Sequence, residues 1–296
     1  GPGGPGGPGG PGGPGAEACS ETISPQFGGP TAGTSCITTT QGETLTYPTD
    51  FGSTLNEVEI YTCPTSQLRV IVSNGIPDHD ITPENPNDLC PVNWMVSIPL
   101  VPTMSGVNTE VSALGIVGIS LNGVPAYGAQ EGGGSNAAEI DASTQGVPSW
   151  GHAARSGDWH YHSGEFGRVG TVEEHTEDVL LGYAMDGFPI YGPVDDDSIL
   201  DECNGLMEPD GSYRYHVRTL AQVDESLTYC NGDSPAVNWN YVLGCYKGVL
   251  TGSSVSDSAV ESLPSDCVLG DATAAPTGTP TGSPTGTPTG TPTGTP

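Results

Sequence analysis

Short apolar runs, each bounded by Gly, Pro, Asn or Asp, recur through the middle of the chain and predict β-strands rather than helices. Seven such runs are rich in Val, Ile, Thr and Tyr: Glu57–Thr62, Leu68–Ser73, Trp94–Val101, Gly115–Leu121, Val179–Ala184, Tyr213–Arg218 and Val237–Leu243. Helical periodicity is nearly absent, and Ser254–Leu263 is the one candidate for a short helix. The pattern therefore predicts an all-β fold.

Turn dipeptides follow several of these runs. Asn-Gly and Asp-Gly favour the tight turns of β-hairpins because both residues tolerate a positive φ. They occur at Asn74-Gly75, Asn122-Gly123, Asp186-Gly187, Asp210-Gly211 and Asn231-Gly232. Together with the cysteines described below, these turns predict a disulfide-stapled sandwich or barrel-like body.

Composition divides the chain into three segments. Residues 1–15 are five copies of Gly-Pro-Gly, residues 16–275 contain all the charged residues and all the cysteines, and residues 276–296 repeat Pro-Thr-Gly-Thr. Proline at regular intervals favours polyproline II, so both ends are expected to be extended, polyproline-II-like tails. A flexible linker is the alternative for the first tail, because five triplets are too short for a collagen unit.

The C-terminal repeat places a hydroxyl at every second position. Dense Ser and Thr among prolines are typical of O-glycosylated stalks, and the chain has no Asn-x-Ser/Thr sequence, so any glycan is expected to be O-linked. The expected acceptors are Thr277, Thr279, Thr281, Ser283, Thr285, Thr287, Thr289, Thr291, Thr293 and Thr295.

The charge of the chain is strongly acidic, with 35 Asp and Glu against 6 Lys and Arg and a formal net charge of -29. Nucleic acids and anionic membranes bind proteins through Lys and Arg, so neither is an expected partner. No apolar run reaches the roughly 18 residues of a membrane span.

The cysteines number eight and are widely spread, at Cys19, Cys36, Cys63, Cys90, Cys203, Cys230, Cys245 and Cys267. No Cys-x-x-Cys pair is present, so a zinc ribbon or thioredoxin-like motif is not expected. An even number of cysteines in such a chain predicts an oxidising compartment, outside the cell or at its surface, and four disulfides. Their connectivity stays open.

Histidines concentrate in Gly157–His162, which reads Gly-Asp-Trp-His-Tyr-His. In a strand, side chains alternate between faces, so Asp158, His160 and His162 would share one face. Two imidazoles on one face of a strand commonly bind a transition metal together. A similar hexapeptide, Gly-Ser-Tyr-Arg-Tyr-His, occupies Gly211–His216.

These motifs resemble the YHYH-domain family, named for its tetrapeptide. The resemblance spans roughly residues 60–250 and includes, besides the two hexapeptides, Ser73–His79, Leu121–Pro125, Gly182–Pro193, Asp201–Gly205 and Gly244–Tyr246. The family occurs in secreted and surface proteins and implies no settled activity. Its members tend to have further histidines at the positions that are Leu206 and Arg214 here.

Two interpretations of the histidines follow. If the two tetrapeptides face each other, His160, His162 and His216, with His152 or His79 nearby, form a site for a divalent metal such as copper or zinc. Alternatively, these side chains form a hydrogen-bonded core network. The acidic group Asp195–Asp197 with Asp201 and Glu202 offers oxygen ligands suited to calcium, but it lacks the spacing of a calcium loop and a solvated acidic turn is the simpler interpretation.

Three functions are compatible with these features. The first is a structural subunit of an extracellular O-glycosylated fibre or surface coat that assembles head-to-tail with copies of itself through its tails. The second is a secreted metal-binding module or metal-dependent enzyme. The third is a carbohydrate-binding module that uses Trp150, Trp159, Trp239 and Tyr241. No known catalytic motif is present, so no catalytic residue is assigned and an enzyme is not expected.

Overall fold

The computed structural model describes residues 27, 35–83, 87–132, 134–137, 151–163, 176–223, 239–256 and 263–270, and the backbone of 228–231 and 234–237. The two terminal repeats, with the ten expected glycosylation sites, lie outside the described residues. The head-to-tail contact through these tails stays a prediction for the same reason.

The described elements are β-strands and two short 3-10 helices, so the predicted all-β class is confirmed. The strands are β1 (Val58–Cys63), β2 (Leu68–Ser73), β3 (Trp94–Pro99), β4 (Met104–Glu110), β5 (Ile116–Ser120), β6 (Pro125–Tyr127), β7 (Gly151–Ala153), β8 (Trp159–Tyr161), β9 (Leu180–Ala184), β10 (Pro189–Tyr191), β11 (Gly205–Met207), β12 (Tyr213–His216), β13 (Thr228–Asn231), β14 (Ser234–Val237), β15 (Cys245–Gly248), β16 (Ser254–Ser256) and β17 (Val268–Leu269). The 3-10 helices are η1 (Thr49–Phe51) and η3 (Asp197–Ile199).

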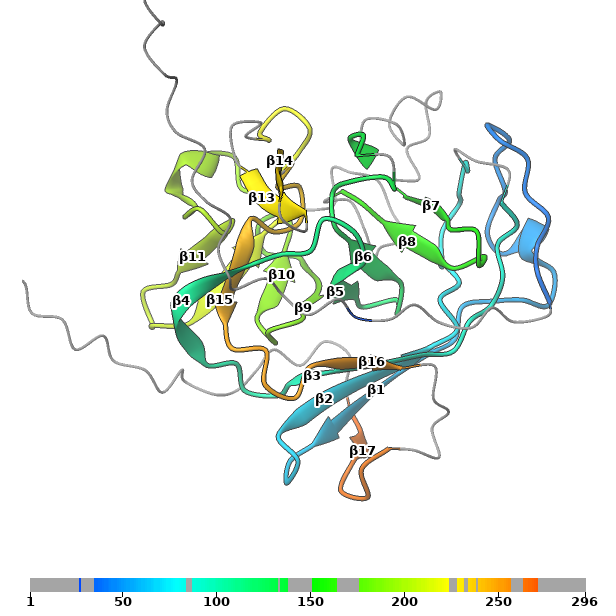
Figure 1. Ribbon diagram of the computed structural model, residues 1–296. Coiled ribbons are helices and arrows are strands. Elements are labelled where there is room, and N and C mark those ends of the chain that lie inside the picture. Colours follow the sequence, from blue (N-terminus) through cyan, green and yellow to red (C-terminus); the bar gives the residue numbers. More distant parts are fainter. Residues whose placement is uncertain are drawn as a thin grey trace, which may run out of the picture.

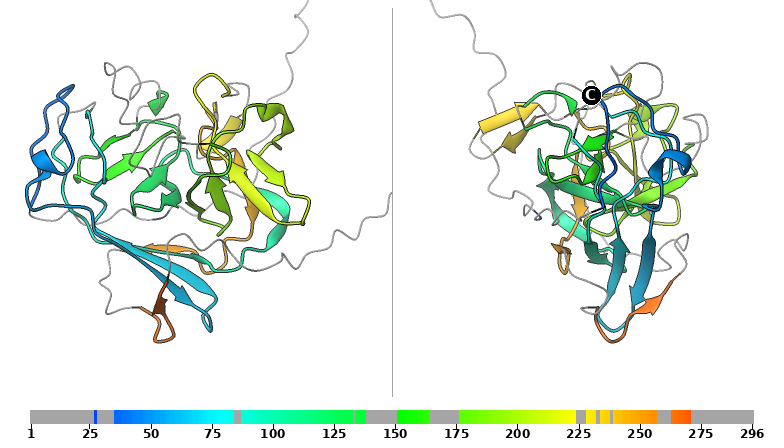
Figure 2. Two further views of the ribbon diagram at one scale, coloured as in Figure 1. Left: turned by 180° about the vertical axis from the view of Figure 1, so that it is seen from behind. Right: turned by 90° about the vertical axis from the view of Figure 1, so that its right-hand side faces the viewer.

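Two larger sheets form the body (Figure 1). The lower sheet is antiparallel, in the order β16-β3-β2-β1-β17. The upper sheet has eight strands, in the order β11-β12-β10-β9-β5-β6-β8-β7, and its two ends lie on opposite sides of the molecule in both Figure 1 and Figure 2. Two strand pairs, β4 with β15 and β13 with β14, complete the fold.

One hydrophobic core lies between the two sheets. Ile60, Ile71 and Val96 from the lower sheet belong to the same buried cluster as Ile119 and Tyr183 from the upper sheet. Burial of apolar area at roughly 25 cal/mol per Å² is the main force that holds such layers together. The predicted sandwich-like body is confirmed.

Three predicted turn dipeptides close hairpins of the upper sheet. Asn122-Gly123 joins β5 to β6, Asp186-Gly187 joins β9 to β10, and Asp210-Gly211 joins β11 to β12. The glycines at 123, 187 and 211 have φ values of 79°, 88° and 87°, which side chains with a Cβ rarely adopt. The local sequence therefore determines these three connections.

Two predicted elements differ from the structure. Val237–Leu243 is not a strand: β14 ends at Val237, and Tyr241 to Leu243 are buried without joining a sheet. The segment is apolar because it is buried in the core. A buried loop is as apolar as a buried strand, so the pattern did not distinguish the two. Ser254–Leu263 begins as strand β16 rather than as a helix, because its first three residues pair with β3.

Three disulfides connect the described cysteines: Cys36–Cys90, Cys63–Cys267 and Cys203–Cys245. No described cysteine is free. Cys19 and the side chain of Cys230 lie outside the described residues, so a fourth disulfide stays a prediction. The described pairs support the expected oxidising compartment, since cytosolic thiols remain reduced.

The disulfide Cys63–Cys267 holds β17 on the lower sheet. β17 pairs with β1 through only two residues, and Val268 and Leu269 are 59% and 66% exposed, so apart from the disulfide it is held mainly by hydrogen bonds of Asp266 and Gly270. We expect Cys63→Ala/Cys267→Ala to lower the free energy of unfolding by about 2–5 kcal/mol. Hydrogen exchange should become fast at residues 268–269, whereas Cys36→Ala/Cys90→Ala should leave that segment protected. Unchanged protection of β17 in the first variant would contradict this role.

Asp186 is a fully buried carboxyl at the β9–β10 turn. It accepts hydrogen bonds from the Tyr215 hydroxyl at 2.6 Å and from the backbone N–H groups of Gly248 at 2.9 Å and Phe188 at 3.2 Å. Burial raises the pKa of Asp186 from 3.8 to about 6, and these hydrogen bonds oppose the rise. The folded protein therefore binds this proton more tightly than the unfolded chain does.

The raised pKa of Asp186 predicts a loss of stability as pH rises from about 4 to about 6. A difference of roughly two pKa units corresponds to about 3 kcal/mol in the free energy of unfolding at pH 7. We expect the stability of Asp186→Asn relative to the wild type to increase by this amount over that range, measured by chemical denaturation. Asp195→Asn, which removes an exposed carboxyl, is the control. A parallel pH dependence of Asp186→Asn and the wild type would be inconsistent with a raised pKa.

Candidate metal centre

The predicted histidine hexapeptide forms β8, which lies next to the edge strand β7 at one end of the upper sheet. In this antiparallel pair His152 lies opposite His160. His162 follows β8 directly and, as the alternation of a strand requires, lies on the same face as His160. Register and alternation thus bring three imidazoles together from two short segments.

The three imidazoles are close enough to share an ion. One ring nitrogen of each of His152, His160 and His162 lies within 4.8 Å of one nitrogen of each of the others. Their ring centroids are 4.6, 5.0 and 4.7 Å apart, and all three side chains are buried. Among the described residues this is the single group of three or more His, Cys, Asp or Glu side chains with such geometry.

Each of these rings has an oxygen near one of its nitrogens. Nδ1 of His162 lies 2.7 Å from the carbonyl oxygen of Gly128, and Nδ1 of His160 lies 3.2 Å from the carbonyl oxygen of Asp158. Nε2 of His152 lies 3.2 Å from Oε1 of Glu131. A ring that donates N–H to such an oxygen has its lone pair on the other nitrogen. Metal-binding histidines are oriented in this way.

The electrostatics of the cluster favour a neutral His160. Burial, followed by the neighbouring imidazoles of His162 and His152, lowers the pKa of His160 well below its usual value. A neutral imidazole can bind a metal ion, whereas a protonated one cannot, so the environment of His160 suits it to be a ligand.

Tyr127 and Asp158 form one wall of the cluster. The Tyr127 ring stacks on His160 with centroids 4.2 Å apart, and its hydroxyl donates to Oδ2 of Asp158 at 3.1 Å. Ser156 also donates to Asp158. Burial raises the pKa values of both Tyr127 and Asp158. These partners hold Asp158 about 4.0 Å from Nδ1 of His160, where its charge can balance a bound cation.

Zinc and copper fit the donor set better than calcium does. Imidazole is a common ligand of zinc and copper, whereas calcium takes six to eight oxygens. Zinc–nitrogen bonds of about 2.0–2.1 Å at tetrahedral angles place ligand nitrogens about 3.4 Å apart, so small ring rotations would complete the site. Glu131, whose side chain is 30% exposed, lies at Nε2 of His152 and can orient this ring so that Nδ1 faces the ion.

The other two expected histidines are not in this cluster. Nε2 of His79 lies 2.6 Å from the hydroxyl of Tyr161, whose side chain points to the opposite face of β8. His216 ends β12, which four strands separate from β8 in the sheet. The expectation that the two tetrapeptides face each other is therefore wrong, because they lie at opposite ends of one sheet. The network interpretation describes His79 and His216 better.

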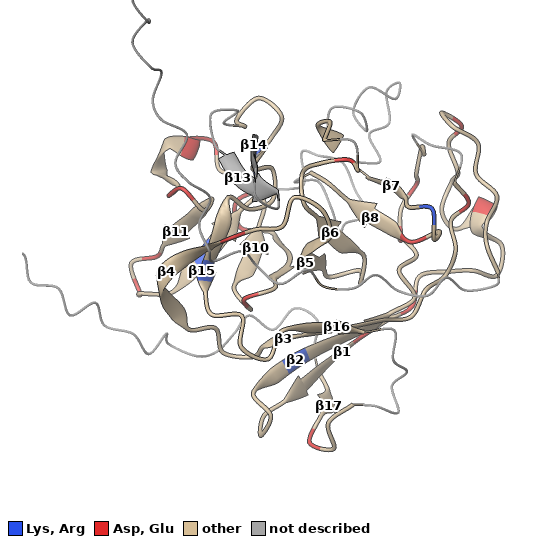
Figure 3. Ribbon diagram, viewed as in Figure 1, with Lys and Arg blue, Asp and Glu red and all other residues tan. Residues whose placement is uncertain are grey.

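The acidic side chains near η3 form hydrogen bonds and ion pairs with other residues of the chain. Asp196 accepts the Ser198 N–H at 3.1 Å, and Asp197 lies 3.3 Å from the guanidinium of Arg218. Lys247 lies 3.3 Å from Asp201 and 2.7 Å from Glu202. These contacts support a structural acidic turn rather than a calcium site. Figure 3 shows the general excess of acidic over basic positions.

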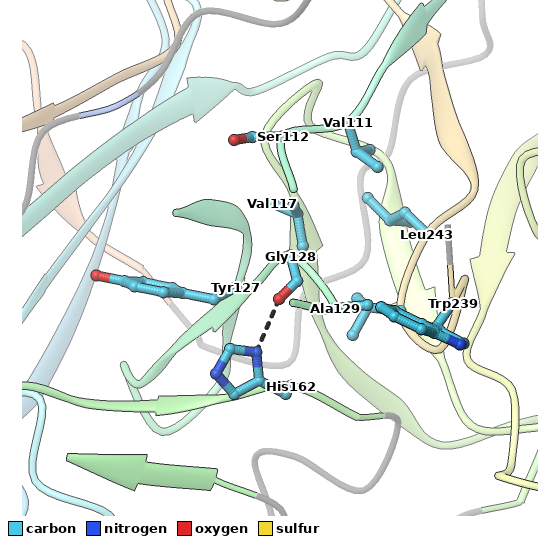
Figure 4. Close-up of a pocket in the computed structure, with 10 residues that line it drawn as sticks. Val111, Ser112, Val117, Tyr127, Gly128, Ala129, His162, Trp239 and Leu243 are labelled. Carbon is cyan, nitrogen blue, oxygen red and sulfur yellow. Dashed lines mark hydrogen bonds between the residues drawn. The ribbon is translucent and has the colours of Figure 1, made fainter. Parts of the chain in front are cut away.

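The three described aromatic residues among those proposed for sugar binding do not form an exposed platform. Trp159 and Tyr241 are buried, Trp150 lies outside the described residues, and Trp239 lines a small pocket with Val111, Leu243 and one side of His162. Figure 4 shows that Nε2 of His162 points away from Leu243 and Trp239. The pocket therefore borders the histidine cluster from the side opposite to Nε2.

Sequence reasoning identified His152, His160 and His162 but missed Tyr127, Gly128 and Glu131. A signal for the first two exists: Asn-Gly-Val-Pro-Ala-Tyr-Gly at 122–128 has the same pattern as Asp-Gly-Phe-Pro-Ile-Tyr-Gly at 186–192. Comparison of the two segments would have marked the Tyr-Gly pair as a repeated feature beside each histidine motif. Nothing comparable marks Glu131.

Comparison with known proteins gives one family match, over part of the chain. Residues 95–199 match the family model described as YHYH protein, which confirms the resemblance although the matched range is shorter than 60–250. No curated protein and no solved structure matches the chain. The matched range includes β7 and β8 with all three clustered histidines, and it ends before β12.

Proposed function

We propose that this chain, which contains a YHYH domain, is an extracellular structural module that binds one divalent transition-metal ion through His152, His160 and His162. The observation that carries the proposal is the geometry of the three buried imidazoles, each of which can contribute one ring nitrogen to a group whose members lie within 4.8 Å of one another. Imidazole nitrogens in such a group are common ligands of divalent transition metals.

The proposed role of the metal is to fix the end of the upper sheet. β7 has three residues and pairs only with β8 among the described strands, so few backbone hydrogen bonds hold it. An ion bound to His152 of β7 and to His160 and His162 would cross-link the two segments. Ligand binding to the folded state adds free energy of about 2.7 kcal/mol at a free concentration 100 times the Kd.

The proposed location outside the cell rests on the disulfides. Three described disulfides require an oxidising environment. In the part of the chain that is described, no helix is both long and apolar enough to cross a membrane. In such a setting a buried three-histidine site and disulfides would act together as cross-links.

The metal proposal is tested by the zinc content of the purified chain after dialysis against micromolar zinc. We expect about one zinc per chain and a higher thermal unfolding temperature with zinc than with a chelator. His160→Ala removes one of three ligands, and we expect an affinity at least about 100-fold weaker. His216→Ala, which removes a histidine of the same sheet outside the cluster, should bind zinc as the wild type does. No zinc in the wild type, or equal loss in both variants, would rule the site out.

A second proposal concerns assembly, and the terminal repeats support it. At about 3.1 Å per residue in polyproline II, the 21 residues of 276–296 span roughly 65 Å, enough to reach across a neighbouring body. Contacts between different surfaces of successive copies propagate as a filament when the rotation does not close. We propose that the chain forms a head-to-tail fibre and that O-glycans cover the C-terminal repeat and shield it from proteases.

Deletion of residues 276–296 tests the assembly proposal. We expect negative-stain electron microscopy to show filaments for the intact glycosylated chain and single particles for the deletion. Deletion of residues 1–15, which consist of Gly and Pro alone, tests the other tail in the same way. Filaments that persist in both deletions would exclude tail-driven assembly, and unmodified repeat peptides in the mass spectrum would exclude the glycans alone.

A further inference from the structure

The upper sheet consists of two matching halves. Along the chain, β5, β6, β7 and β8 are followed by β9, β10, β11 and β12. In each half the first two strands form an antiparallel hairpin, the second pairs in parallel with the fourth, and the third pairs antiparallel with the fourth at the sheet edge. The halves meet where β5 pairs with β9, and Ile119 lies opposite Tyr183 at the centre.

The registers of the two halves agree residue by residue. The pairs Ile116–Tyr127 and Gly118–Ala126 of β5 and β6 correspond to Leu180–Tyr191 and Gly182–Ile190 of β9 and β10, and both hairpins have an irregularity at this place. Similarly, Gly151–Tyr161 at the first edge corresponds to Gly205–Tyr215 at the second. The halves are thus related by an approximate two-fold axis through the centre of the sheet.

Buried polar contacts are repeated as well. Nδ1 of His162 lies 2.7 Å from the Gly128 carbonyl, and Nδ1 of His216 lies 2.8 Å from the Gly192 carbonyl. The Tyr161 hydroxyl bonds to Asn122 at 3.0 Å, just as the Tyr215 hydroxyl bonds to Asp186 at 2.6 Å. His216 therefore occupies the position in the second half that His162 occupies in the metal centre.

The remaining two positions of the second half are changed. His152 and His160, which lie opposite each other, correspond to Leu206 and Arg214, which also lie opposite each other. The Arg214 guanidinium lies over the Tyr191 ring at 4.7 Å, as the His160 ring stacks on Tyr127 at 4.2 Å. Nε of Arg214 lies 2.6 Å from Oε1 of Glu208, so the guanidinium charge is balanced.

We infer that β10, β11 and β12 form a second, equivalent site, in which the guanidinium of Arg214 supplies the positive charge that a divalent metal supplies in the first. His216 keeps the ligand geometry: its Nε2 is buried and has no hydrogen-bond partner among the described residues. Leu206 and Arg214 are then the two residues that exclude a metal from this half. For the identity of the ion, this inference rests on the proposed metal function. The match of the two halves is independent of that proposal.

The test is the exchange Leu206→His/Arg214→His, made in the full-length oxidised chain. It places three imidazoles at the second site in the register of the first, and it leaves Glu208 to balance the ion. We expect equilibrium dialysis with zinc to show one more bound zinc per chain than the parent. The matched control Leu206→Gln/Arg214→Gln removes the same cation without adding imidazoles, and it should bind as the parent does.

The outcomes separate this inference from the proposed function. A variant that binds one more zinc than its parent supports the second site, whether the parent binds one or none; a parent that binds none refutes only the first site. A folded variant with no additional zinc overturns the inference. Near-UV circular dichroism reports whether the variant is folded.

The reciprocal exchange keeps the inference testable if that variant does not fold. His152→Leu/His160→Arg gives the first site the residues of the second. We expect this chain to fold, to bind no zinc, and to unfold at the same temperature with and without a chelator. His152→Gln/His160→Gln lacks the guanidinium and should be less stable than the exchange. If the exchange is no more stable than this control, a guanidinium does not replace the metal.

Discussion

The antiparallel pairing of β5 with β9 is the contact on which the rest of the body depends. It joins the β5–β6 hairpin to the β9–β10 hairpin within one sheet. Two glycines allow the close approach of the two backbones: a Cβ at Gly118 would meet the carbonyl oxygen of Tyr183, and one at Gly182 would clash with the carbonyl oxygen of Ile119. Because this pairing lies at the centre, the two histidine motifs are carried to opposite edges of the sheet. The position of the three-histidine cluster thus follows from backbone pairing far from it.

At the edge of the sheet, the register of the strands decides which side chains meet. His152 meets His160 because β7 and β8 pair antiparallel, and Gly128 reaches His162 because β6 pairs with β8 in parallel. Burial also lowers the pKa of His160, so the packing that forms the cluster keeps this ring neutral and able to bind a cation. At the other edge Leu206 and Arg214 are only partly buried, and Arg214 forms an ion pair with Glu208. The two edges of the sheet therefore have the same backbone arrangement but different side chains at equivalent positions.

The sequence predicted features that depend on local chemistry. The strands at Leu68–Ser73 and Val179–Ala184 and the Asn-Gly and Asp-Gly turns agree with the structure, because short-range propensity decides them. The prediction that His216 lies close to His160 was wrong. Which strands become neighbours depends on pairing between segments more than fifty residues apart, and local sequence does not decide it. Val237–Leu243 failed for another reason: burial alone does not distinguish a strand from a packed loop.

Binding of a single ion by three imidazoles of one sheet edge can be measured by X-ray absorption at the zinc edge of the zinc-loaded chain. We expect three imidazole nitrogens at about 2.0–2.1 Å, with one oxygen completing the coordination. A spectrum with oxygen shells alone, or with fewer than three imidazoles, would contradict it.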